Sequence, residues 1–267
     1  MSVQTLYSAA TGMSAMETKL DVIANNLANV ETTGFKKARA NFEDLFYRNE
    51  KMPGAQDSSG QYTPVGIAIG LGSKVSSTQN DYIQGAFQLT DNQLDLAIQG
   101  NGFFQVTDPD GTIKYTRAGN FSKNANGDIV MGSANLGRRL EPPITIPEDA
   151  TDISISAEGV VSVRQPGNNQ LQEIGQIELA YFVNPQGLLQ MGENLLAETD
   201  ASGAPTQGNP GQDAFGMLQQ GSLEASNVEP VEELIGLIST QRAFELNSKA
   251  VQVGDEMMQI VANLKRI

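Results

Sequence analysis

The chain has 267 residues, of which 31 are acidic and 17 basic, so its formal net charge is −14 at neutral pH. This charge disfavours a nucleic-acid ligand, because binding to phosphates needs clustered Lys and Arg. The chain has no His and no Cys, which excludes Ser–His and Cys–His nucleophiles and disulfides. We therefore predict no catalytic residue, no cofactor and no metal site. No continuous apolar stretch follows Met1, so neither a cleaved secretory signal nor membrane insertion is expected.

An amphipathic helix is predicted from about Leu6 to Val30. Large apolar residues recur every seven positions, and a second set is interleaved three positions on, which makes a stripe that another helix must cover. The two sets are Leu6, Met13, Leu20, Leu27 and Ala9, Met16, Ile23, Val30. The pattern ends at residues 31–34, where Gly34 suits a left-handed turn. We expect the amides of Asn25, Asn26 and Asn29 to satisfy main-chain groups where this helix ends.

The helical periodicity of the sequence is lost after a second short amphipathic stretch at residues 42–47. Between residues 49 and 77, Gly and Pro recur without periodicity, which predicts an extended irregular arm. The residues that mark it are Pro53, Gly54, Pro64, Gly66, Gly70 and Gly72. A long irregular segment is unusual inside a compact domain, so we expect the arm to reach toward a neighbouring molecule.

An antiparallel β domain is predicted from about residue 81 to residue 199. Apolar residues there alternate with a period of two, as in Leu94, Leu96 and Ile98, and turn signals separate the runs. Those signals lie at residues 108–111, 126–128, 158–159 and 184–187. Residues 200–212 are rich in Gly, Pro and Ser and are predicted to be a link.

A closing helix is predicted to run to about Leu264. Residues 226–229 resemble a capping box, and Pro230 suits the first turn. The helix carries one apolar series at seven-residue spacing and another at eleven, which suits a straight helix with neighbours on more than one side. The two series are Leu237, Phe244, Val251, Met258 and Ile235, Leu246, Met257.

The predicted fold class is therefore mixed α and β. Terminal helices pair in a coiled coil, and a central, mainly antiparallel β domain and an extended irregular arm lie between them in the sequence. The free energy gained by burying one stripe is smaller than the conformational-entropy cost of ordering about 25 residues. We accordingly expect both ends to be disordered in the free subunit and to fold on assembly. The alternative is a monomer whose two helices pack on the β domain.

Residues 24–36 resemble the signature shared by bacterial flagellar rod and hook proteins, with Asn25, Asn26, Asn29, Gly34 and Phe35 as its marked positions. Further matches cover residues 95–104, 115–121, 226–228 and 241–250, so the similarity extends over essentially the whole chain. Within that family the length, residues 53–56 and residues 192–195 resemble the members of the distal rod. Proximal-rod and hook-type subunits are the alternatives.

The resemblance implies a structural protein, not an enzyme, in the part of the basal body that spans the periplasm. Residues 1–35 and 226–267 would form a terminal helical domain that lines an export channel, and residues 81–225 an outer β domain. Residues 36–80 would be a connector whose stretch at about 47–72 stiffens the rod. Phe42 and Phe46 match an export motif of the type III apparatus, and the alternative is an amphipathic turn that packs on a neighbouring molecule. The implied partners are further copies in a helical polymer, proximal rod proteins, the hook protein, the rod cap and the L- and P-ring proteins.

The predicted assembly interface combines the apolar residues of both terminal helices. Its members are Leu6, Met13, Met16, Leu20, Ile23, Leu27, Val30, Leu234, Leu237, Ile238, Phe244, Leu246, Val251, Met257 and Met258. Two other classes of function stay open: a glycan-binding or glycan-cleaving β domain with helical anchors, and a monomeric secreted factor.

Overall fold

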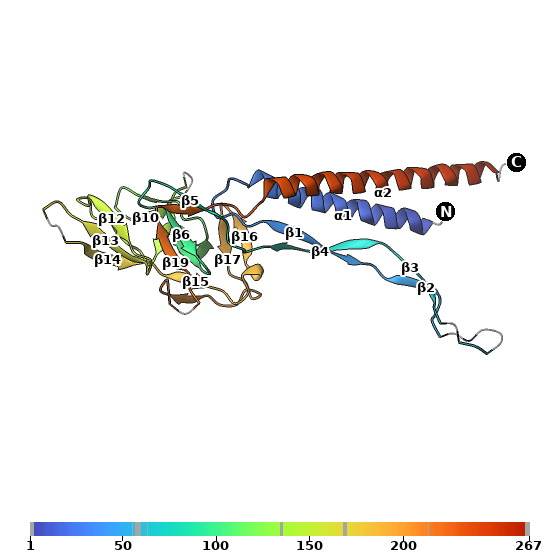
Figure 1. The fold of residues 1–267 in the computed structure, drawn as a ribbon, viewed down its shortest axis with the longest axis horizontal. Coiled ribbons are helices and arrows are strands. Elements are labelled where there is room, and N and C mark those ends of the chain that lie inside the picture. Colours follow the sequence, from blue (N-terminus) through green and yellow to red (C-terminus); the bar gives the residue numbers. More distant parts are fainter. Residues whose placement is uncertain are drawn as a thin grey trace. The chain divides into compact units, whose positions relative to one another are not determined.

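The computed structural model describes residues 3–54, 56, 60–62, 64–133, 136–167, 170–212 and 214–264. The chain divides into two compact units, which we call the helix unit and the β unit. The helix unit comprises Met1–Ala28, Ala38–Asn80 and Glu229–Ile267, and the β unit comprises Asn29–Lys37 and Asp81–Val228. Figure 1 shows the elements of both units along the chain.

The helix unit contains two helices, α1 (Val3–Ala28) and α2 (Pro230–Leu264), which lie side by side (Figure 1). They run antiparallel, because Gly12 lies against Asn247 while Ile23 lies against Gly236. A methyl group added at Gly12 would lie only 3.2 Å from the Asn247 Nδ2 atom. Thr240, also on α2, is 2% exposed, and its hydroxyl donates to the Gly236 carbonyl oxygen. The helices therefore approach through small and polar residues and leave much of their large apolar surface outside the contact.

Both helices begin or end a few residues from the predicted bounds. Helix α1 ends at Ala28, so Val30 lies in the turn that follows, where the Thr32 amide donates to the Asn29 carbonyl oxygen at 3.2 Å. Helix α2 begins at Pro230, a residue that can occupy a first turn because no partner is needed for its nitrogen. The predicted capping box is wrong, since the Ser226 hydroxyl accepts from the amide of Val228, two residues on, before the helix starts.

Most of the described part of the arm forms paired strands, which corrects the prediction of an irregular excursion. Strand β1 (Ala38–Asp44) pairs antiparallel with β4 (Ser73–Asn80), and β2 (Tyr47–Lys51) pairs antiparallel with β3 (Ile67–Gly70) (Figure 1). Residues 42–44 of the predicted amphipathic stretch thus belong to strand β1. The Gly and Pro residues lie at the ends of these strands, as at Pro53, Gly54 and Gly72, and so they delimit a two-stranded ribbon.

The β unit is antiparallel throughout its described residues. There the main sheet has nine strands in the order β16-β17-β8-β7-β11-β10-β9, with β15 paired to both β7 and β18, and a three-stranded sheet has the order β12-β13-β14. Two further pairs are β6 with β19 and β5 with β20. The bounds are β5 (Phe87–Leu89), β6 (Leu96–Gln99), β7 (Phe103–Thr107), β8 (Ile113–Thr116), β9 (Phe121–Lys123), β10 (Ile129–Met131), β11 (Arg139–Glu141), β12 (Asp152–Ile155), β13 (Val160–Arg164), β14 (Gln172–Gln176), β15 (Leu179–Tyr181), β16 (Leu189–Gly192), β17 (Leu195–Ala197), β18 (Thr206–Gly208), β19 (Met217–Gln220) and β20 (Ser222–Glu224), with a 3₁₀ turn at Pro185–Gly187.

The predicted turns are confirmed, but the predicted link is wrong. Residues 108–111 join β7 to β8, residues 126–128 lie between β9 and β10, and residues 158–159 join β12 to β13. Residues 200–212 contain β18, whose three residues pair with β15. Gly, Pro and Ser are rare in strands, so a short strand among them leaves little signal in the sequence.

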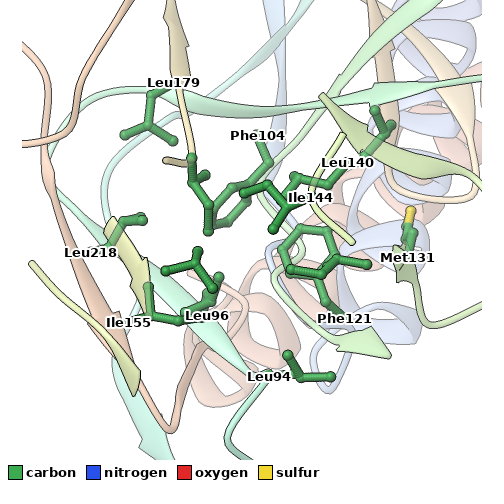
Figure 2. Close-up of a cluster of buried hydrophobic side chains, with 14 of the residues drawn as sticks. Leu94, Leu96, Phe104, Phe121, Met131, Leu140, Ile144, Ile155, Leu179 and Leu218 are labelled. Carbon is green, nitrogen blue, oxygen red and sulfur yellow. The ribbon is translucent and has the colours of Figure 1, made fainter. Parts of the chain in front are cut away.

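The β unit has one large hydrophobic core and a smaller second cluster around Phe103 and Phe182. Figure 2 shows side chains from distant segments, including Leu96, Phe104, Phe121, Leu140 and Leu179, converging on the large core. The rings of Phe104 and Phe121 meet edge to face with centroids 5.1 Å apart. The five consecutive residues 94–98 are all buried, so the alternation of Leu94, Leu96 and Ile98 does not mark a face open to solvent.

Candidate assembly surface

An exposed apolar stripe runs along α2. Its residues follow one another at spacings of three, four, seven or eight, which places them on one face of a straight helix. We define the α2 stripe as Val231, Ile235, Ile238, Leu246, Val253, Met257 and Ile260, all of which are exposed. Leu246 alone is 66% exposed and Ile235 62%. Each such side chain would gain about 1.5–3 kcal/mol from full burial, so the stripe is a surface that another apolar surface would stabilise.

The other residues predicted for the interface differ in exposure. On α2, Leu234, Phe244 and Met258 are exposed, while Leu237 and Val251 are half-buried. On α1, Ile23 is 6% exposed, because it packs against Gly236 of α2. Half-buried positions are Leu6, Met13, Met16, Leu20 and Leu27 on α1, and Val30 after it. The α2 side of the predicted interface is thus the more open one.

Asn26 has a different partner from the one expected. Its side chain is 1% exposed, its Nδ2 donates to the Ala38 carbonyl oxygen at 2.8 Å, and its Oδ1 accepts from the Ala38 amide at 2.9 Å. One amide side chain thus pairs with the first residue of β1 as a neighbouring strand would. The spacing of the asparagines indicated main-chain bonding, but nothing in it pointed to a residue twelve positions on.

Gly34 holds a turn that only glycine fits, as predicted. Its φ is +69°, its amide donates to the Glu224 carbonyl oxygen at 2.8 Å, and a side chain there would lie 2.7 Å from the main-chain carbon of Arg117. Phe35 follows, half-buried, and its carbonyl oxygen accepts from the Asn227 amide at 3.4 Å. The signature therefore sets the path of the chain after α1.

The β2–β3 ribbon carries a second set of exposed apolar residues. Ile67 and Ile69 of β3 alternate on one face, in register with Lys51 and Arg48 of β2. On the other face the Tyr47 ring covers Gly70, where an added methyl group would lie 3.5 Å from it. A hydrogen bond to Asp44 and the charge of that carboxylate raise the pKa of Tyr47. An isolated two-stranded ribbon is marginal in water, so this surface too favours a neighbour.

The remaining predicted arm and export positions lie in or beside this ribbon. Phe46 is 88% exposed and Phe42 is 37% exposed. A side chain at Gly66 would overlap the main chain of Lys51, which explains the need for glycine where β3 approaches β2. Pro64 is exposed, whereas Ala55 of the motif at residues 53–56 lies outside the described residues.

Neither a metal centre nor a membrane span emerges from the described part of the chain. No group of three or more acidic side chains there could hold a metal ion. No helix within those residues is long and apolar enough to cross a bilayer.

Three family models match the chain. A model described as flagella basal body rod protein matches residues 6–36, the D1 domain of the flagellar hook protein FlgE/F/G matches residues 97–163, and the C-terminal region of the flagellar basal body rod FlgEFG protein matches residues 219–264. Together with the two helices and the β unit, they define the class as a flagellar rod or hook protein.

Curated relatives narrow the class. The flagellar basal-body rod protein FlgG of Caulobacter vibrioides is 47% identical over 264 residues, which are 98% of this chain and 100% of the relative. The FlgG proteins of Borreliella burgdorferi and Bacillus subtilis are 44% and 39% identical, and each alignment covers at least 99% of both chains. The chain therefore belongs to the FlgG family of flagellar basal-body rod proteins.

Proposed function

We propose that this chain is a structural subunit of the distal part of the flagellar rod and polymerises into a rigid helical tube. The exposed α2 stripe, in a chain of this family, is the observation that carries the proposal. Identical subunits that meet through unlike surfaces, without closing a ring, extend into a helical filament. The tube transmits torque from motor to hook, and its lumen serves as part of the export channel.

The helices of many copies make the inner wall in this proposal. The α2 stripe of one copy is covered by helices of its neighbours in coiled-coil contacts, since α1 covers only the face that carries Gly236 and Thr240. Residues 1–35 and 226–267 form this inner layer, and residues 81–225 form an outer layer. The same burial orders helices that an isolated subunit leaves partly bare.

The ribbon of the arm supplies stiffness. Exposed Ile67 and Ile69 on β3 give it an apolar face that a neighbouring subunit would cover. Such a contact braces adjacent subunits against bending, because it adds an interaction far from the inner wall. Pro53, Gly54, Pro64, Gly66, Gly70 and Gly72 delimit or shape this ribbon.

The partners follow from the position in the basal body. Proximal rod proteins and the hook protein lie at the two ends of the distal rod, a rod cap assists growth, and the L- and P-ring proteins surround it. The type III apparatus exports the subunit and engages Phe42 and Phe46, whose exposed rings are open to recognition.

A charge placed in the α2 stripe tests the inner-wall contact. In a flagellated host that lacks its own FlgG, Leu246→Glu is expected to be exported but to give no distal rods, because a carboxylate would be buried in an apolar interface. Gln252→Glu adds the same charge at another exposed α2 position and is the matched control. Electron microscopy of isolated basal bodies measures the outcome. Normal rods from the Leu246→Glu chain would contradict the proposed interface.

A further inference from the structure

The chain passes between the helix unit and the β unit at four points, after residues 28, 37, 80 and 228. The connecting segments therefore include residues 29–37, the chain from residue 81 onward, and the chain that leads to residue 228. These segments lie far apart in the sequence. On the β-unit side they are joined to one another by polar groups.

Asn227 joins three of these segments with one side chain. Its Oδ1 accepts from the Lys37 amide at 2.7 Å, and its Nδ2 donates to the carbonyl oxygens of Asp81 at 2.8 Å and Ile83 at 3.1 Å. Its own amide donates to the Phe35 carbonyl oxygen. The Asp81 amide also donates to the Lys37 carbonyl oxygen at 2.8 Å. Asn227 thus takes the place of a strand that would pair with both neighbours.

A buried ion pair ties the same segments a second time. Lys36 Nζ lies 2.6 Å from Glu224 Oε1, and the two side chains are 5% and 0% exposed. Lys36 also donates to the Ile83 carbonyl oxygen at 2.8 Å, and Glu224 Oε1 accepts from the Gly85 amide at 3.0 Å. Burial lowers the pKa of Lys36, and the charge of Glu224 opposes that shift. Such a pair is costly to bury unless good geometry and further hydrogen bonds offset the loss of solvation. Here Glu224 Oε1 accepts from both Lys36 and Gly85, whereas Glu224 Oε2 is buried without a hydrogen-bond partner among the described residues.

The main chains of the connecting segments are closely packed around Glu224 and Asn227. A side chain on Gly85 would overlap the carbonyl oxygen of Ala225, and one on Gly34 would overlap the main chain of Arg117. Arg117 adds a second cation, its Nε 3.7 Å from Glu224 Oε2, and its Nη2 donates to the Gly100 carbonyl oxygen. The segments are therefore packed at main-chain distance as well as hydrogen-bonded.

We propose that Asn227, Lys36 and Glu224 are positioning residues of a load-sharing clamp, which holds the connecting segments of the β unit as one cooperative element. A force applied to one connecting segment is then distributed over the other connecting segments. The strands of the β unit therefore do not unfold one at a time. The bearing of torque rests on the proposed rod function, whereas the cooperativity of the clamp is a property of the single chain.

Native-state hydrogen exchange of the full chain tests the cooperativity. In Asn227→Ala, the amides of Gly34 and Gly85 are expected to exchange at least tenfold faster together with that of Lys37, although neither of the first two bonds Asn227 directly. The amides of core strands β7 and β11 should change less than twofold. Asn184→Ala, which removes a side-chain bond to the Ala201 carbonyl oxygen elsewhere in the β unit, is the matched control.

Two outcomes separate a clamp from an ordinary buried polar cluster. Faster exchange at Lys37 alone, or an equal acceleration over the whole β unit, would overturn the clamp. Asn227→Ser keeps a short polar side chain without adding a charge beside the Asp81 and Ile83 carbonyl oxygens, so it provides a milder variant if Asn227→Ala does not fold. The assay uses the unassembled chain, so its result stands whether or not Leu246→Glu blocks rod formation.

Discussion

The Asn26 side chain forms two hydrogen bonds to the main chain of one residue, as a neighbouring strand would. Both of its polar groups bond the main chain of Ala38, so α1 and β1 are held at a fixed separation by an amide that solvent does not reach. Buried polar groups of this kind are costly only when unpaired, and here both are paired. Tyr115 in the β unit is a second case, since its hydroxyl donates to Glu198 Oε2 at 3.4 Å and it is 2% exposed.

Because of Tyr115, we expect the stability of the folded chain to fall at alkaline pH. Burial, and next the charge of Glu198, raise the pKa of Tyr115 from 10.0 to about 12. A raised pKa in the folded state favours the protonated, folded chain, so this contribution is complete below pH 10 and is lost as the pH rises toward 12. Tyr115→Phe should therefore lose less stability than the parent between pH 10 and 12, measured by urea unfolding.

Glu198→Gln provides the check on that prediction. It removes the neighbouring charge and keeps an acceptor for the hydroxyl, so the absorbance titration of Tyr115 near 295 nm should shift to lower pH. Identical slopes of stability against pH for the parent and Tyr115→Phe would show that Tyr115 does not titrate as described.

Each helix uses two kinds of residue for two kinds of contact. Inside the chain Gly12 lies against Asn247 and Gly236 against Ile23, and Thr240 is buried, while the α2 stripe stays open. Small residues allow close approach but bury little apolar area, so the pair of helices gains little stability by itself. The β ribbons of the arm are similarly thin, with two strands and no layer over β2 and β3 among the described residues.

Removal of the β2–β3 ribbon should make the rod more flexible without blocking export. The Leu71 amide already donates to the Phe46 carbonyl oxygen at 3.1 Å, so Tyr47–Gly70 can be replaced by an Asn-Gly turn with β1 and β4 kept. Phe42 and Phe46 remain for export. Electron microscopy of released rods measures their curvature. Equal bending of shortened and parent rods would exclude a stiffening role, and a Tyr62→Ser chain, altered only near the tip, controls for the substitution itself.

Charge is distributed unevenly over the molecule. The β unit has 19 acidic and eight basic residues, a net charge of −11 out of −14 for the whole chain. The helix unit is close to neutral for its length, which suits surfaces that meet copies of themselves, because like charges there would repel. Acidity concentrated in the β unit favours solubility of the free subunit without penalising helix contacts.

The free chain should be folded in its β unit and frayed in its helices. The large core around Phe104 and Phe121 needs no partner, whereas the α2 stripe does. In dilute solution the amides of α1 and α2 are therefore expected to exchange within seconds and those of β7 to be protected for hours, by hydrogen-exchange mass spectrometry. Assembled rods should protect both. Long-lived protection of α1 and α2 in a dilute, unassembled chain would contradict assembly-linked folding.

Much of the fold could be predicted because it depends on patterns among residues that are close in the sequence. The seven-residue series placed both helices, turn residues such as Gly111, Gly127 and Gly159 placed the hairpins, and Gly34 marked its own left-handed turn. The arm was missed because strands β2 and β3 pair across 15 intervening residues rich in Gly and Pro, which read locally as loop. Residues 200–212 were missed for the same reason, since β18 gains its structure from β15.

The sequence by itself determined which residues form helices, where the chain turns, and that no His or Cys chemistry is possible. Only the tertiary structure decided that the helices meet through Gly12 and Gly236, that Asn26 bonds Ala38, and that Asn227 joins residues 37, 81 and 83. Periodicity reports which face of an element is apolar, because that depends on neighbours three or four residues away. The choice of partner depends on distance in space, which no local pattern records.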